Sequence, residues 1–197
     1  MLLGRRTPVT ILLLAAIGAM FVAEKLQGGS TDEAALVTLG ANVPVLVREG
    51  QYWRLLASMF LHIGILHLAV NAWALYQLGA LFELLLGSLP LLLVYFASGI
   101  AGSIATVMFT RADLSAGASG AIFGVMGALI AFLLKRRDVL TPQARSLLMQ
   151  LVGWAALNVV LGFSIPGIDN AAHLGGCAAG FLLGFTLRPR FRPAMEL

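Results

Sequence analysis

The sequence predicts an all-α protein that crosses a membrane with six helices, folded as a single domain over residues 1–197. Hydrophobic residues make up 59% of the chain and charged residues only 11%, against about 25% charged in an average soluble domain. Six apolar runs approach the length of about 20 residues that a membrane-spanning helix needs. Breaks rich in glycine, proline and charge separate these runs, as turns and loops do.

The six predicted helices span approximately residues 8–26, 66–86, 89–109, 119–134, 146–163 and 171–187. The first could be mistaken for a cleaved signal sequence. However, Phe21 stands where cleavage after Ala23 would need a small residue, so we expect this helix to be retained. The chain length leaves room for one compact bundle, and we expect no appended soluble domain.

The distribution of cations predicts the orientation of the bundle. With the N-terminus in the cytoplasm, most of the 13 Lys and Arg residues fall on the cytoplasmic side: Arg5, Arg6, Lys135, Arg136, Arg137, Arg145, Arg188, Arg190 and Arg192. The positive-inside rule therefore places both termini in the cytoplasm. This clustering also explains the net charge of +4 without a nucleic-acid partner.

The alternating direction of the helices brings the polar residues together. The second, fourth and sixth predicted helices all run from the outside inwards, so His67, Asn71, Ser119 and His173 lie near their outer ends. Any chemistry between these side chains would take place close to external water.

Ser119 and His173 are the candidate catalytic pair. An isolated membrane serine could simply hydrogen-bond a local carbonyl, but an ionisable histidine inside a span indicates a functional site. Together they suit attack by a hydroxyl, with His173 taking the Ser119 proton and later returning it to the leaving amine. Asp169 lies in the preceding loop, so we expect a dyad without a carboxylate.

His67 and Asn71 lie four positions apart on one helix face. They could form a hydrogen bond between helices, or they could donate to an oxyanion together with the backbone N–H of Ser119. A metal site is disfavoured because His62, His67 and His173 show no HExxH spacing and the spans contain few carboxylates. We expect no metal and no cofactor.

Small residues predict how two of the helices pack. If the small residues of the fourth and sixth helices face each other, their close approach would bring Ser119 to His173. Phe123 would then lie against the imidazole, or would pack as an ordinary core or lipid-facing residue. The residues concerned are Gly120, Gly124, Gly127 and Ala131, and Gly176, Gly180 and Gly184.

The connection between the first and second helices, residues 28–65, is unusually long for a loop. Tyr52 and Trp53 indicate an element lying in the membrane interface, with Arg54 reaching lipid headgroups or an acidic partner. Glu83, near the inner end of the second helix, is expected to have a structural partner, since an unpaired carboxylate is costly in a membrane.

Four motifs, in this order along the chain, give the sequence a family resemblance. They are Trp53-Arg54-Leu55-Leu56-Ala57-Ser58-Met59-Phe60-Leu61-His62, His67-Leu68-Ala69-Val70-Asn71, Gly117-Ala118-Ser119-Gly120 and Ala172-His173-Leu174-Gly175-Gly176. They resemble the Trp-Arg loop motif and the HxxxN, GxSG and AHxxG motifs of rhomboid intramembrane serine proteases. The whole chain resembles the minimal six-helix form, with a long, partly embedded loop after the first helix.

This resemblance implies that Ser119 is the nucleophile, His173 the general base, and His67 with Asn71 the oxyanion hole. The reaction would be hydrolysis of a peptide bond in or beside the transmembrane segment of another membrane protein, in a lipid environment. The resemblance also favours a bacterial inner membrane, and it implies a helix-pairing role for Glu83. It indicates neither the substrate nor the oligomeric state. Phe123 stands where the family often has tyrosine.

Two other functions remain open from the sequence. A non-catalytic rhomboid-like adaptor or chaperone would bind membrane clients without cutting them. A transporter or channel would need a polar path across the bilayer, and the inner halves of the predicted helices offer hardly any ionisable group besides Glu83.

Overall fold

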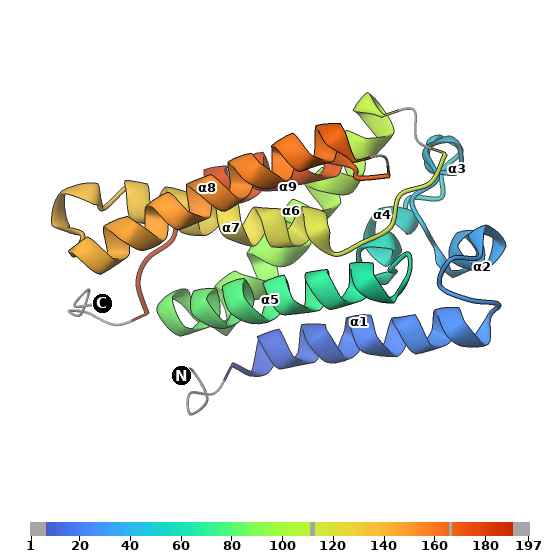
Figure 1. The fold of residues 1–197 in the computed structure, drawn as a ribbon, viewed down its shortest axis with the longest axis horizontal. Coiled ribbons are helices and arrows are strands. Elements are labelled where there is room, and N and C mark those ends of the chain that lie inside the picture. The colour runs from blue at the N-terminus through green and yellow to red at the C-terminus, as the bar shows by residue number, and fades with distance from the viewer. Residues whose placement is uncertain (1–6, 111–112, 166, 191–197) are drawn as a thin grey trace.

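The computed structural model describes residues 7–110, 113–165 and 167–190, and over these ranges the chain is helical, with no β-strand. The one pairing of extended backbone in this part of the chain is an isolated antiparallel bridge between Asn42 and Ser115. The prediction of an all-α fold is confirmed (Figure 1).

The long helices are α1 (Pro8–Leu26), α5 (Ile65–Leu86), α6 (Ser88–Phe109), α7 (Ser119–Leu134), α8 (Pro142–Ser164) and α9 (Asn170–Gly184). Within the described ranges, α1, α5, α6 and α8 are long and apolar enough to cross a membrane. With 16 and 15 residues, α7 and α9 are shorter. The number of spans, six, therefore stays a prediction.

Two helix boundaries differ by more than one residue from those expected. α8 begins at Pro142 rather than at 146, because Thr141 Oγ1 caps it by accepting from the Ala144 N–H at 3.3 Å and because proline suits a first helical turn. α9 ends at Gly184 rather than at 187. Neither difference moves the candidate site residues.

The connection between α1 and α5 is folded rather than extended. It contains α2 (Glu33–Leu39), α3 (Pro44–Arg48), α4 (Arg54–Ala57) and the 3-10 turn η1 (Ser58–Phe60), while η2 (Arg137–Val139) joins α7 to α8. Figure 1 shows α2, α3 and α4 gathered at one end of the bundle, where α5, α7 and α9 begin. The starts of these three helices therefore lie at a common end.

α7 lies at the centre of the molecule, with every residue from Gly120 to Leu133 buried. Its closest neighbour is α9, and glycine makes the approach possible. A Cβ on Gly176 would lie 2.0 Å from the carbonyl oxygen of Gly120, and one on Gly180 would lie 1.9 Å from that of Gly124. The expected meeting of the two small-residue faces is confirmed.

Glu83 joins α5 to the start of α1. Its buried carboxylate accepts from the Val9 and Thr10 N–H groups at 3.0 and 2.9 Å, from Thr10 Oγ1 at 2.8 Å and from Ser88 Oγ at 2.6 Å. It satisfies backbone donors at the N-terminus of α1, which have no partners within the helix. The structural role expected for Glu83 is confirmed.

The expectation that Arg54 reaches headgroups or an acidic partner is wrong. Arg54 is only 5% exposed, and its Nη1 donates to the carbonyl oxygens of Val37 and Ala41 at 2.7 and 3.1 Å. Between these carbonyls, Gly40 is covered by Trp53, whose ring would lie 2.3 Å from an added Cβ. The connection folds back on itself, so its buried carbonyls need a donor from within the chain.

Candidate active site

Ser119 and His173 meet at the end of the bundle where α7 and α9 begin. Ser119 is the first residue of α7, and His173 lies in the first turn of α9. Ser119 Oγ and His173 Nε2 are 2.9 Å apart, a hydrogen-bond distance, and the histidine is 8% exposed. The glycine contacts between α7 and α9 allow this approach, because backbone meets backbone without intervening side chains.

The imidazole is held on one face by Phe123. The two rings stack with their centroids 4.2 Å apart and their planes 7° from parallel. Phe123 follows Ser119 by one helical turn, so both residues of α7 contact the same histidine. The expectation that Phe123 lies against the imidazole is confirmed, and the ring restricts how the histidine can turn.

His67 and Asn71 come from the first two turns of α5. A Cβ on Gly117 would lie 2.8 Å from His67 Cε1 and 3.8 Å from Ser119 Oγ, so the absence of a side chain at Gly117 leaves room for the His67 ring beside the serine. Asn71 Nδ2 donates to the His67 carbonyl at 2.9 Å. An amide carries two N–H donors, so Asn71 retains one more.

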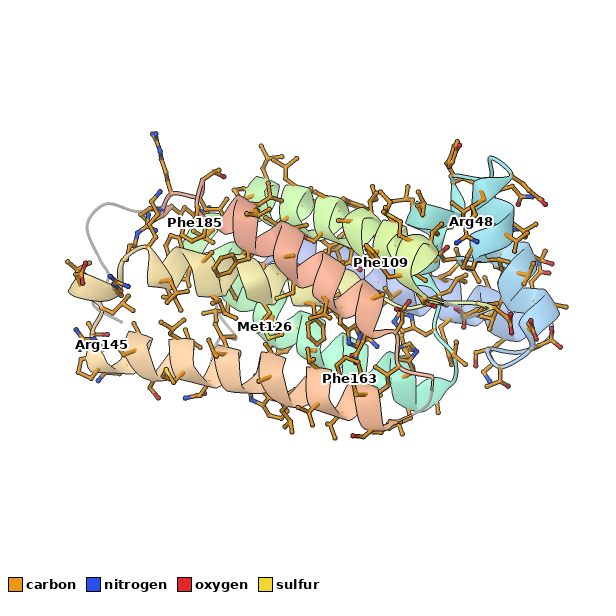
Figure 2. The ribbon with its side chains drawn as sticks, turned by 90° about the horizontal axis from the view of Figure 1, so that it is seen from above. Arg48, Phe109, Met126, Arg145, Phe163 and Phe185 are labelled. Atoms are coloured by element: carbon orange, nitrogen blue, oxygen red, sulfur yellow. The ribbon has the colours of Figure 1, made fainter. Side chains whose placement is uncertain are left out.

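A cavity of about 1550 Å³ joins these side chains, and its lining includes Ser119, His173, His67 and Asn71. Its walls come from α5, α6, the start of α7, α8, α9 and the loop before α7. Figure 2 shows α8 along one edge of the molecule, with Arg145 near its start. Phe163, near the end of α8, lines the cavity and lies at the same end of the molecule as Phe109.

A second histidine, His62, lies next to His67. The rings of His62 and His67 have centroids 5.2 Å apart, and the His62 backbone N–H donates to the buried Glu24 carboxylate at 2.7 Å. Burial lowers the pKa of His62 to about 4. The His62 ring is therefore neutral near pH 7 and places no positive charge beside the His67 ring.

Sequence reasoning missed the surroundings of Asp169. Its carboxylate accepts hydrogen bonds from Thr106 Oγ1, Ser115 Oγ and the Ala172 backbone N–H. Its place just before an apolar helix is a typical N-cap signal and could have predicted the last of these contacts. The contacts to Thr106 and Ser115 join distant parts of the chain and left no signal in the sequence.

In the part of the chain that the structure describes, no three His, Cys, Asp or Glu side chains are grouped so that they could hold a metal ion. Cys177, one turn after His173 on α9, is partly buried and forms no disulfide.

Fold and site together define a class: a helical membrane protein in which a serine and a histidine from two central helices share a hydrogen bond at one end of the bundle. Residues 49–190 match the family model of the Rhomboid domain. The chain therefore belongs to the rhomboid family.

Named relatives agree with this assignment. The chain is 41% identical over 178 residues to rhomboid protease GluP of Bacillus subtilis (strain 168), a match covering 90% of this chain and 34% of the relative. It is 38% identical to RHOMBOID-like protein 1 of Arabidopsis thaliana, covering 79% of this chain and 40% of that protein. It is 32% identical to the putative rhomboid protease YdcA of B. subtilis, covering 92% and 89%. The chain thus spans well under half the length of the first two relatives.

Proposed function

We propose that the chain is an intramembrane serine endopeptidase that hydrolyses peptide bonds in or beside the transmembrane segments of other membrane proteins. The observation that carries the proposal is the 2.9 Å contact between Ser119 Oγ and His173 Nε2 inside a cavity of about 1550 Å³. Similarity to one relative named as a rhomboid protease and to another named as a putative rhomboid protease supports it.

In the first step His173 acts as the general base. Nε2 accepts the proton of the Ser119 hydroxyl while Oγ forms a bond to the carbonyl carbon of the scissile peptide. The acceptor role of Nε2 requires the neutral imidazole to carry its proton on Nδ1. The stacked Phe123 ring keeps Nε2 directed at the serine during this transfer.

The negative charge that develops on the carbonyl oxygen needs donors beside Ser119. We assign this role to the Ser119 backbone N–H, the His67 ring and the second N–H of Asn71. His67 and Asn71 line the same cavity as the serine, and His67 lies against Gly117. Loss of one such donor costs about 2.7–4 kcal/mol of transition-state stabilisation in other serine proteases.

Collapse of the tetrahedral intermediate breaks the C–N bond, and the proton on His173 Nε2 passes to the leaving nitrogen. The acyl ester on Ser119 is then attacked by water, with His173 taking a proton from the water and returning it to Oγ. We propose that this water enters from the external side, with both termini of the chain in the cytoplasm.

We propose α8 and the loop from Gly162 to Asn170 as the gate for the substrate. The buried residues of α8, Ala144, Leu148 and Leu151, all lie in its first half. Residues of its second half, including Asn158 and Phe163, line the cavity. A helix anchored at one end and bordering the cavity at the other can move aside to admit a transmembrane segment.

A cleavage assay tests the proposal. Wild-type protein, Ser119→Ala and His173→Ala are incubated in liposomes with single-span substrates, and the products are identified by mass spectrometry. We expect cleavage by the wild type and a loss of at least about 1000-fold in both variants, since removal of a triad member elsewhere is at least this costly. Ser146→Ala, an exposed serine at the far end of α8, is the control and should cleave normally.

Labelling of the nucleophile separates a protease from an adaptor. A fluorophosphonate should label wild-type protein and Ser146→Ala, and it should fail to label Ser119→Ala. Folded wild-type protein that binds single-span clients but neither cleaves them nor reacts at Ser119 would show the adaptor instead.

A further inference from the structure

The carboxylate of Asp169 joins three segments at the active-site end of the bundle. Its Oδ1 accepts from the Ala172 backbone N–H at 3.0 Å, which caps α9. Its Oδ2 accepts from Thr106 Oγ1 at 2.5 Å and from Ser115 Oγ at 2.7 Å. Thr106 belongs to the last turn of α6, and Ser115 to the loop that leads into α7. Hydrogen bonds to a charged carboxylate are stronger than those between neutral groups.

The contact between Ser115 and Asp169 has the same spacing along the sequence as the candidate catalytic pair. Ser115 precedes Ser119 by four residues, and Asp169 precedes His173 by four residues. The upstream pair meets at 2.7 Å and the downstream pair at 2.9 Å. A shift of α9 along α7 that separated Ser119 from His173 would therefore also have to break the contact between Ser115 and Asp169.

The backbone of Ser115 is held by hydrogen bonds to Asn42. Its backbone N–H and carbonyl both pair with Asn42 at 2.9 Å, and Asn42 Nδ2 donates to the Ser103 carbonyl at 2.9 Å. Two residues later, the Gly117 N–H donates to the Ser58 carbonyl at 2.9 Å. The loop carrying the nucleophile is thus held to the folded connection after α1, so it offers Asp169 a rigid anchor.

The start of α9 has little freedom in the remaining directions. An added Cβ on Gly102 of α6 would lie 2.7 Å from the Ala172 carbonyl oxygen, and one on Gly120 of α7 would lie 3.3 Å from it. Contacts of this kind limit sideways movement of α9. The hydrogen bonds of Asp169 restrict movement along the helix axis and rotation, which packing of small residues controls poorly.

We propose that Asp169, Ser115 and Thr106 form a positioning clasp that holds His173 Nε2 at hydrogen-bond distance from Ser119 Oγ. The inference rests on the proposed protease function and adds positioning residues to it. Among the described residues, the hydrogen-bond partners of the Asp169 carboxylate do not include the His173 ring, and we assign its effect to the positions of α9 and of the nucleophile loop. It is not the third member of a catalytic triad.

Substitutions of the hydroxyl donors test the clasp while the cap of α9 stays in place. We expect Ser115→Ala and Thr106→Val each to lower kcat about 10- to 100-fold with KM within twofold, because a displacement near 1 Å can cost about 100-fold in rate. The rate of fluorophosphonate labelling at Ser119 should fall in parallel. Ser115→Thr and Thr106→Ser retain the hydroxyl and should recover at least half of the wild-type kcat.

Asp169→Asn tests the carboxylate of the clasp, and Asp32→Ala is its control at another helix cap. The asparagine side chain of the first variant would still cap α9, since asparagine caps as well as aspartate, but it would lack the charge to which both hydroxyls donate. We expect a kcat loss as large as in Ser115→Ala. Asp32 caps α2 in the same way, accepting from the Ala35 N–H at 2.7 Å, and lies outside the clasp. Asp32→Ala should keep kcat within twofold of wild type.

Several results would overturn the clasp. One is unchanged kcat and labelling in Ser115→Ala and Thr106→Val with a reactive wild type. Another is a loss of activity that only follows the loss of folded protein, with labelling per folded molecule unchanged. A wild type that neither cleaves nor labels would defeat the protease proposal itself, and the clasp with it, so the two failures can be told apart.

Discussion

At the scale of single residues, the site depends on how tightly the His173 ring is held. Ser119 contacts its Nε2 and Phe123 covers one face. Neither contact requires a charge. The side chain is therefore oriented mainly by a ring and by the register of α9, rather than by a carboxylate bonded to Nδ1.

The stacking predicts the effect of changing Phe123. Phe123→Ala should lower kcat about 2- to 12-fold, since ring pairs of this kind contribute about 0.5–1.5 kcal/mol. Phe123→Tyr should stay within twofold of wild type because it keeps the ring. Cleavage kinetics in liposomes measure both. Phe185→Ala, which removes a partly exposed ring beyond the far end of α9, is the control. Equal activity of Phe123→Ala and wild type would contradict the orienting role.

At the scale of elements, contact between α7 and α9 should control stability. Gly180→Ala places a Cβ 1.9 Å from a backbone oxygen of α7, where no flexible side chain can give way. We expect it to destabilise the fold by at least about 1–3 kcal/mol, the usual cost of overpacking. Thermal unfolding in detergent measures the change.

Gly18 of α1 supplies the matched control for Gly180. An added Cβ at Gly18 meets nothing within 4 Å. Gly18→Ala should therefore be neutral or stabilise the protein by up to about 1 kcal/mol, because alanine favours a helix more than glycine does. If both alanine variants melt at the same temperature, the close approach of α7 and α9 is not what limits stability.

α8 yields a prediction about substrate entry. Asn170 Nδ2 donates to the Val159 carbonyl at 3.2 Å, which ties the second half of α8 to the start of α9. If α8 is the gate, Asn170→Ala should raise the cleavage rate of a helical substrate severalfold while the labelling rate of Ser119 stays near wild type. Gln150→Ala, whose side chain bonds only within the first half of α8, is the control. A slower or unchanged rate would argue against gating by α8.

At the scale of the whole molecule, the arrangement predicts which residues face each side of the membrane. α2, α3 and α4 lie at the end where the candidate site opens, and α8 begins at the opposite end (Figure 1). In a Cys177→Ala background, Thr31→Cys should react with a membrane-impermeant maleimide added outside intact cells. Gln143→Cys should react only after the membrane is opened. The reverse pattern would invert the proposed orientation.

The helical architecture and the candidate pair Ser119 and His173 can be predicted from the amino-acid sequence alone. A chain in a bilayer must satisfy its backbone hydrogen bonds internally, so long apolar runs broken by glycine and charge have to become helices. The sequence also predicts that the small residues of α7 and α9 face each other, because the spacing of residues along a helix is local. It thereby predicts that Ser119 and Phe123 of α7 both contact His173.

The hydrogen-bond partners of the buried polar side chains, in contrast, follow from the three-dimensional fold. Arg54 was expected at the lipid surface, but it is buried against the carbonyls of Val37 and Ala41. The position of Asp169 before α9 indicates a helix cap, but its contacts to Thr106 of α6 and to Ser115 of the nucleophile loop appear only in the fold. Such contacts depend on which donor meets which acceptor after the chain has folded, and no local pattern of residues encodes that pairing.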